Sequence, residues 1–152
     1  MAKDSKREKI LVYLVTALSR IKEIRSDILR LQPTLADIEL FADTQFPVVA
    51  VVGGFPVPVE VKRSARKTEN VDAFKSQLDV EIFVYDRTDV GCDTRLSDLA
   101  DEIWKNVWSD PTMDGNALYC ACTFDGRPTP FPPYIAVRSV LSVSYLHSTG
   151  GI

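Results

Sequence analysis

The stretch FKSQLDVEIFVY, residues 74–85, alternates side-chain character at every second position. Leu78, Val80, Ile82 and Val84 recur two residues apart, with mainly polar or aromatic residues between them. A period of two places successive side chains on opposite faces of a β-strand. The stretch therefore predicts a long strand with one face toward the core and the other toward water.

Helical spacing appears on the N-terminal side of this strand. Apolar residues recur four and three apart from Ile10 to Leu31, which predicts a helix over Lys6–Leu31. Ser5 and Glu8 have the spacing of a capping box at its start. This stripe could form a coiled coil, but covering a sheet is favoured because several strands need a helical layer.

A second long helix follows the strand. Its apolar repeat covers Leu96–Trp108, with Asp93 or Thr94 as the expected cap and Asp110-Pro111 as the expected end. A short helix is expected over residues 34–41, between the two long ones.

The remaining segments predict strands and links, and most links are too short for the crossovers of a parallel sheet. The predicted elements are a buried strand over Pro47–Val52, a tight hairpin turn at Gly53-Gly54, an edge strand over Phe55–Val61 with Pro56 and Pro58, a long mobile loop over Lys62–Asp72, a strand over Ala117–Phe124, a polyproline-like bridge over Gly126–Pro133 and a last strand over Tyr134–His147. We therefore expect one domain over residues 1–152 with an α+β fold. Two main helices would cover one face of a mostly antiparallel sheet of about 4–5 strands, as a two-layer sandwich.

Composition narrows the function classes. The 152 residues are 45% hydrophobic and 26% charged, which is ordinary globular usage. Lys and Arg number 18 against 21 Asp and Glu, and this balance disfavours a duplex-DNA binder that neutralises phosphates. No apolar run approaches the ~20 residues of a membrane span. The charged start MAKDSKREK does not resemble a signal peptide, so we expect the chain to stay in a reducing compartment with free thiols.

Two acidic residues offer one candidate for catalysis. Asp79 and Glu81 stand two apart on the predicted strand, so their carboxylates share a face. Metal-dependent nucleases place acids in this way, usually with a lysine nearby. Residue 83 is Phe83 instead of that lysine, and a solvated strand face is the favoured interpretation.

Metal-ligating residues are few. Cys120 and Cys122 share a predicted strand face, and Cys92 and the single histidine, His147, could complete a Cys₃His zinc site or one Cys–His nucleophile pair. Buried free cysteines are favoured because the short knuckle spacing of a zinc site is missing.

Three further patterns are read as structural. The acids of Asp86–Asp93 miss the spacing of a calcium loop, Gly53-Gly54 lacks the rest of a phosphate-binding loop, and the PxxP of Pro130–Pro133 suffices as a rigid lead into the last strand. No catalytic, metal or cofactor residue is therefore assigned.

Two groups of residues are candidates for binding partners. The first is the cationic cluster Lys62, Arg63, Arg66 and Lys67, which is either a solvated loop or a contact with an acidic partner or nucleic acid. The second is Trp104 and Trp108, four apart on the second long helix, for which core packing is the first expectation and an interface anchor the alternative.

The order of elements resembles the tail terminator proteins of long-tailed bacteriophages, also called tail-completion or minor tail proteins. The resemblance spans nearly the whole chain and rests on packing and turn patterns. The stretches that carry it are QFPVVAVVGG (residues 45–54), LDVEIFVY (78–85), LSDLADEIW (96–104) leading to Asp110-Pro111, and VSYLHSTGGI (143–152).

This resemblance implies a structural virion protein at the head-proximal end of the tail, assembled in the host cytoplasm. Copies would form a ring, usually a hexamer, that caps the tail tube protein, stops its polymerisation and presents a surface to the head–tail connector. DNA would only pass through the lumen. By analogy, the Lys62–Asp72 loop and the end of the chain from His147 to Ile152 would contact neighbouring rings. A neck or connector protein and a tail tube subunit are alternatives in the same class, and a nuclease or a small adaptor lies outside it.

Overall fold

The computed structural model describes residues 5–63, 71–124 and 128–148, and only the backbone of residues 59–63, 71–74, 122–124 and 147–148. The helices are α1 (Lys6–Leu18), α2 (Leu35–Glu39) and α3 (Cys92–Ser109), with a short 3₁₀ helix η1 (Asp43–Gln45). The strands are β1 (Val48–Gly53), β2 (Val57–Arg63), β3 (Val71–Arg87), β4 (Tyr119–Phe124), β5 (Thr129–Phe131) and β6 (Tyr134–Ser148).

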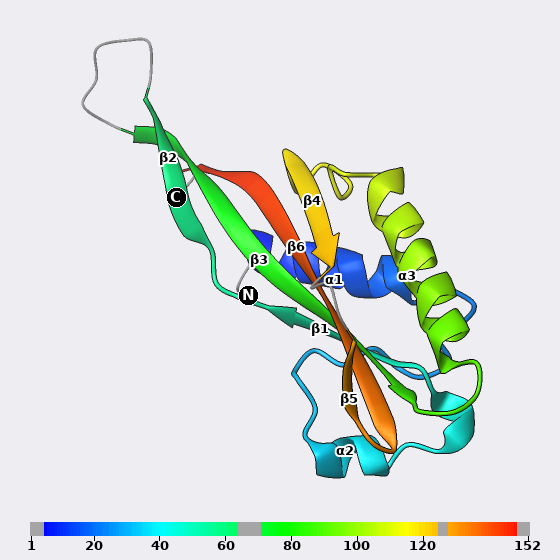
Figure 1. The fold of residues 1–152 in the computed structure, drawn as a ribbon. Coiled ribbons are helices and arrows are strands. Elements are labelled where there is room, and N and C mark those ends of the chain that lie inside the picture. The colour runs from blue at the N-terminus through cyan, green and yellow to red at the C-terminus, as the bar shows by residue number, and fades with distance from the viewer. Residues whose placement is uncertain (1–4, 64–70, 125–127, 149–152) are drawn as a thin grey trace.

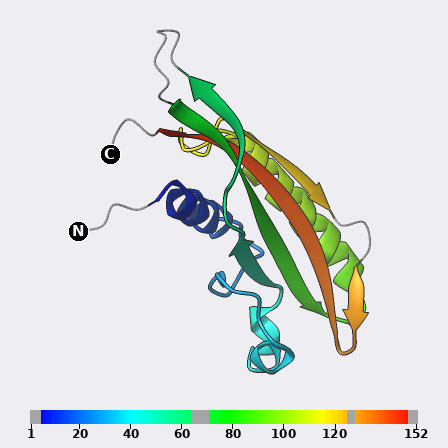
Figure 2. The ribbon, with the colours of Figure 1, turned by 90° about the vertical axis from the view of Figure 1, so that its left-hand side faces the viewer.

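The sheet is built on two long strands. β3 and β6 pair along their length, from Ala73 opposite Ser148 to Arg87 opposite Tyr134. β1 and β2 follow each other along the outer edge of β3, and β4 and β5 do the same along β6. Figures 1 and 2 show the central pair running the length of the fold, with α2 at one end. All these pairs are antiparallel, which confirms the predicted α+β class, although the sheet has six strands instead of 4–5.

The main core lies between one face of the sheet and the two long helices. Buried side chains of α1 and α3 pack against β1, β3 and β6 in one cluster, which confirms the predicted helical layer. A smaller cluster on the opposite face joins Ile38 of α2 and Phe46 to Val48, Ala50 and Tyr85. The outer face of the sheet is therefore apolar and covered at this end, where the sequence predicted a face toward water.

The first helix ends at Leu18, so the prediction of a helix to Leu31 is wrong. Ile21 and Ile24 remain in the core, but Leu29 joins the edge of β1. The Leu29 N–H donates to the Val49 carbonyl at 3.0 Å, and its own carbonyl accepts from the Val51 N–H at 2.8 Å. β-Branched isoleucines suit an extended chain, and the unpaired backbone groups of β1 favour this pairing over further helix.

At two of the three described α-helices, the residues that cap the N-terminus are those that the sequence indicates. Glu8 N–H donates to Ser5 Oγ at 3.1 Å as predicted, although the Glu8 carboxylate binds Arg30 rather than closing the box. Thr34 and Asp37 form the complete capping box of α2. In contrast, α3 begins after Gly91, whose φ of 98° suits glycine, and neither Asp93 nor Thr94 caps it.

Gly53-Gly54 does not form the predicted hairpin turn. β1 and β2 both pair with β3, and the Gly54 N–H continues the ladder to the Asp79 carbonyl at 2.9 Å. A Cβ on Gly53 would lie 2.7 Å from the Leu11 side chain, so glycine here allows α1 to approach the strand. β2 instead pairs with β3, and these two strands include both ends of the predicted Lys62–Asp72 loop, whose middle part, residues 64–70, lies outside the described residues.

The predicted polyproline-like bridge is partly a strand. Thr129–Phe131 pairs with β6, from Thr129 opposite Ala136 to Phe131 opposite Tyr134. Pro130 is compatible with this pairing because β5 is an edge strand. Of the helices in the described part of the chain, none is both long and apolar enough to cross a membrane.

Candidate assembly surface

Two exposed tryptophans occupy one flank of α3, and we call them the tryptophan patch. Trp104 and Trp108 retain 36% and 45% of their accessible surface, and their ring centroids lie 5.7 Å apart. Core packing, the first expectation for this pair, therefore does not hold. Large exposed apolar residues in pairs favour the alternative, a contact surface.

The position of the patch follows from helical geometry. Asn106 Nδ2 donates to the Ala17 carbonyl at 3.0 Å, so the Asn106 side of α3 faces α1. Each tryptophan lies two residues from Asn106, which is about 160° around a helix. The patch is thus directed away from α1.

A charge cluster fixes the start of α3. Asp86, only 1% exposed at the end of β3, accepts hydrogen bonds from Arg95 Nε at 2.9 Å and Nη2 at 3.3 Å. Arg95 Nη2 also donates to Asp89 at 2.6 Å. These two carboxylates raise the pKa of the Arg95 guanidinium, mainly through the hydrogen bonds to Asp86. The acidic loop therefore holds the start of α3 to the end of β3, in agreement with the polar turn expected there.

A second exposed apolar segment lies at the junction of β1 and β2. We call Phe55-Pro56-Val57-Pro58 the proline ridge, in which Phe55 is 78% and Val57 61% exposed. The sequence alone predicts only an edge strand at these residues. The signal that could have identified them is the combination of prolines, which cannot join a ladder, with large apolar residues between them.

Arg7 holds this ridge in place. Its Nε donates to the Gly54 carbonyl at 2.7 Å and its Nη2 to the Gly53 carbonyl at 3.0 Å. The same guanidinium lies 4.4 Å from the centre of the Phe55 ring, a cation–π distance. The ridge is therefore fixed to the first turn of α1 and presents its apolar side chains outward.

The predicted cationic cluster is only partly within the described residues. Lys62 and Arg63 belong to β2 and pair through their backbones with Ala73 and Val71. Arg66 and Lys67 lie outside the described residues, as does Ile152. The backbone of His147 pairs with Phe74 in β6, and its side chain is among those not described. The contact roles of these residues remain predictions.

The two acids of the nuclease hypothesis are engaged in local contacts. Asp79 Oδ1 accepts from Ser142 Oγ at 3.0 Å and from Gln77 Nε2 at 3.2 Å. Arg138 Nε donates to Glu81 Oε2 at 2.6 Å, in the next row of the same face. Within the described side chains, no group of three or more His, Cys, Asp or Glu is arranged to hold a metal ion. The observed contacts fit the favoured solvated-face interpretation.

The cysteines do not converge on one site. Cys120 is buried in the main core, and burial raises the pKa of its thiol. It pairs with Val143, opposite Leu78, whereas Cys92 starts α3 beyond the end of β3 at Arg87. Along β3, Leu78 at the level of Cys120 is nine residues from Arg87, the last residue before the link to Cys92, and nine strand residues span about 30 Å. A zinc site that uses both cysteines is therefore incompatible with the fold.

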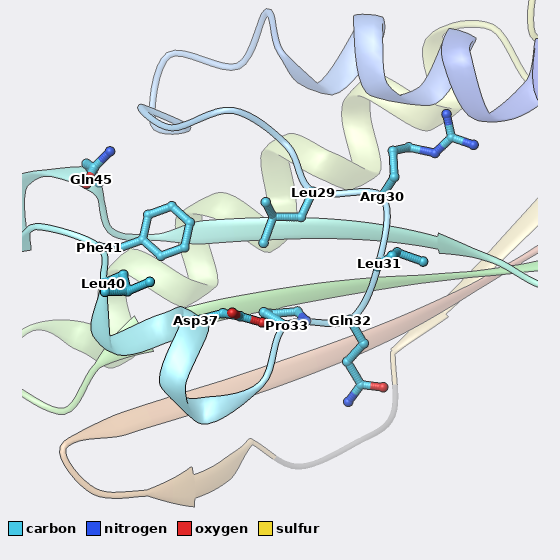
Figure 3. Close-up of a pocket in the computed structure, with 9 residues that line it drawn as sticks. All are labelled: Leu29, Arg30, Leu31, Gln32, Pro33, Asp37, Leu40, Phe41 and Gln45. Atoms are coloured by element: carbon cyan, nitrogen blue, oxygen red, sulfur yellow. The ribbon is translucent and has the colours of Figure 1, made fainter.

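A cavity of about 650 Å³ lies between the chain at residues 29–33 and α2 (Figure 3). Leu29, Leu40 and Phe41 are among its apolar lining residues. Its charged groups are used elsewhere: Figure 3 shows Arg30 turned toward α1, where it binds Glu8, and Asp37 accepts from the Thr34 N–H. These two charged groups of the cavity thus serve local structure.

The chain was also compared with known proteins. No protein-family model matches the sequence, and no curated protein is significantly similar to it.

Proposed function

We propose that this protein is a tail terminator of a long-tailed bacteriophage and acts by assembly rather than by catalysis. Copies of the chain form a ring, a hexamer by resemblance to that family, which binds the last ring of the tail tube. The bound ring stops further addition of tube protein and presents its other face to the head–tail connector.

The observation that carries this proposal is the tryptophan patch. The chain buries four apolar residues of α3 in its core, yet leaves the two largest side chains of that helix at the surface. Exposed aromatic pairs of this kind are typical anchors of protein–protein contacts. A ring subunit needs such surfaces, since a stable contact covers about 800 Å² on each partner.

The polar groups fit the same role. The buried or paired charges described above hold strands, caps and helix starts: Arg95 with Asp86, Arg138 with Glu81, and Arg30 with Glu8. A net charge of −3 also suits a ring through which DNA passes without binding, because DNA phosphates are repelled by acidic surfaces.

The test is the length of tail tubes assembled with and without this protein. Tube protein of the same virus is polymerised alone and with increasing amounts of the chain, and tube lengths are measured by electron microscopy. We expect the mean length to fall and the distribution to narrow as the chain is added. An unchanged distribution would contradict the proposal.

Two related roles would give other results. A tube subunit would form long fibres when it is purified alone. A head-side connector would bind heads but leave tube length unchanged.

A further inference from the structure

We propose that the proline ridge of one copy packs against the tryptophan patch of the next copy, as the repeated contact of the ring. This inference rests on the proposed function and assigns residues to its ring interface. Its basis is that these two exposed apolar features of the described surface differ in shape and lie on different sides of the molecule.

The placement of the two surfaces fits a closed ring. The ridge lies at the edge formed by β1 and β2, on the outer side of β3. The patch lies on α3, which Figure 1 shows beside β4, the strand at the opposite edge of the sheet. A ring requires that two different surfaces of one subunit meet, whereas a twofold dimer joins one surface to itself. Ridge and patch supply such a pair.

The two surfaces also complement each other chemically. Pro56 and Pro58 remove backbone donors, so this part of the edge is poorly suited to strand addition by a neighbour. Extended proline-containing segments are instead recognised by aromatic side chains, which pack against the proline rings. Trp104 and Trp108 provide two adjacent rings of this kind. The prolines restrict the backbone in advance, which lowers the entropy lost on contact.

Charge favours the same pairing. Arg7 lies against the ridge, and Lys6 lines the hollow beside Phe55, Pro56 and Pro58. On the other side, α3 carries four acidic residues, Asp93, Asp98, Asp101 and Glu102, against the two cations Arg95 and Lys105. Asp101 stands three residues before Trp104 and so lies next to the patch, where it pairs with Lys105 at 2.8 Å. The four acids against two cations leave α3 as a whole with an excess of two negative charges. A basic ridge therefore meets an acidic helix, which steers the two surfaces together.

The experiment uses the full chain with three double variants. The ridge variant is Phe55→Ser with Val57→Ser, and the patch variant is Trp104→Ala with Trp108→Ala. The control is Leu31→Ser with Leu40→Ser, which removes two other exposed apolar side chains, beside the cavity of Figure 3. Each protein is treated with a short lysine-reactive cross-linker, alone and with tail tubes, and the covalent oligomers are resolved by mass.

The wild type and the control are expected to give the same series of oligomers up to the ring. In the ridge and patch variants, the concentration needed for half assembly should rise at least about tenfold. An equal mixture of these two variants retains one intact ridge and one intact patch. It should therefore form mixed dimers and no larger species.

Three outcomes would overturn the inference. Rings in both variants would exclude ridge and patch from the contact between copies. A ridge variant that assembles normally beside a defective patch variant would indicate a contact of patch with patch. A patch variant that forms rings but no longer binds tubes would assign the tryptophans to the tube protein.

The tube-length assay separates these failures from failure of the proposed function. If the wild type still shortens tubes, the terminator role stands and only the interface is wrong. If the wild type neither forms oligomers nor shortens tubes, both proposals fail.

Discussion

The helices α1 and α3 cover the same face of the sheet, but they use their apolar residues differently. α1 buries five of its 13 residues, and Ile10, Leu11 and Leu18 have no exposed surface. α3 buries four of its 18 residues in one narrow stripe and exposes Trp104 and Trp108. The comparison shows that α1 directs its largest apolar side chains into the core, whereas α3 buries one narrow stripe and leaves its two largest side chains exposed, as the proposed contact requires.

The largest effect is expected in the buried stripe of α1. Leu14→Ala should lower the free energy of unfolding by about 3 kcal/mol, because it removes a fully buried side chain and leaves a cavity. Val12→Ala on the exposed side of the same helix is the matched control and should cost less than about 1 kcal/mol. Urea unfolding followed by circular dichroism measures both. If both substitutions lowered the free energy of unfolding equally, the distinction between a buried and an exposed side of α1 would be wrong.

A smaller effect is expected where α3 begins. Arg95→Ala leaves the buried Asp86 carboxylate without its guanidinium partner and should cost about 2 kcal/mol. The matched change, Lys105→Ala, breaks exposed ion pairs with Asp101 and Glu102 and should cost about 0.5 kcal/mol or less. The same urea assay applies. If Arg95→Ala lowered the free energy of unfolding no more than Lys105→Ala, the Arg95–Asp86 ion pair would not anchor α3.

The tryptophan patch should contribute little to folding. Trp104→Ala with Trp108→Ala is expected to lower the free energy of unfolding by less than about 2 kcal/mol for the pair, since a large part of each ring is already in contact with water. Thermal unfolding of the dilute variant beside the wild type tests this expectation. A loss above about 2 kcal/mol would make α3 a folding helix like α1 and would contradict the comparison.

The smallest effect is a pH dependence in the core beneath the helices. Burial raises the pKa of the Cys120 thiol above its ordinary value of 9.0, so the folded state keeps this proton at a pH where the unfolded state loses it. The resulting stability is complete below pH 9 and declines as the pH rises above it. Unfolding in urea at pH 8 and pH 9.5 should show this decline, and Cys120→Ala should reduce it. An equal slope in both proteins would exclude the thiol as its cause.

Much of the sheet was predictable from local patterns. The alternation of residues 74–85 placed β3, and the apolar run at Pro47–Val52 placed β1, because side-chain periodicity reports directly which face is buried. The stripe from Ile10 to Ile24 also identified core residues correctly. Its helical assignment failed beyond Leu18 because Leu29 pairs with Ala50 of β1, a partner 21 residues away that no local pattern reveals.

The candidate contact surface was less accessible to sequence reasoning. Trp104 and Trp108 follow the buried residues Ile103 and Val107 by one position each, so their exposure depends on how α3 is rotated against the sheet. The ridge at Phe55–Pro58 depends on β1 and β2 sharing one edge of β3, which contradicts the hairpin that Gly53-Gly54 suggested. Both features arise from long-range pairing rather than from local propensity.

Imaging of tube ends tests the central claim most directly. Tail tubes are assembled with the full chain carrying an electron-dense label, and single tubes are viewed by electron microscopy. A terminator must appear as a labelled ring at one end of each tube, with none along its wall. Label spread along the tubes, or missing from both ends, would contradict the account.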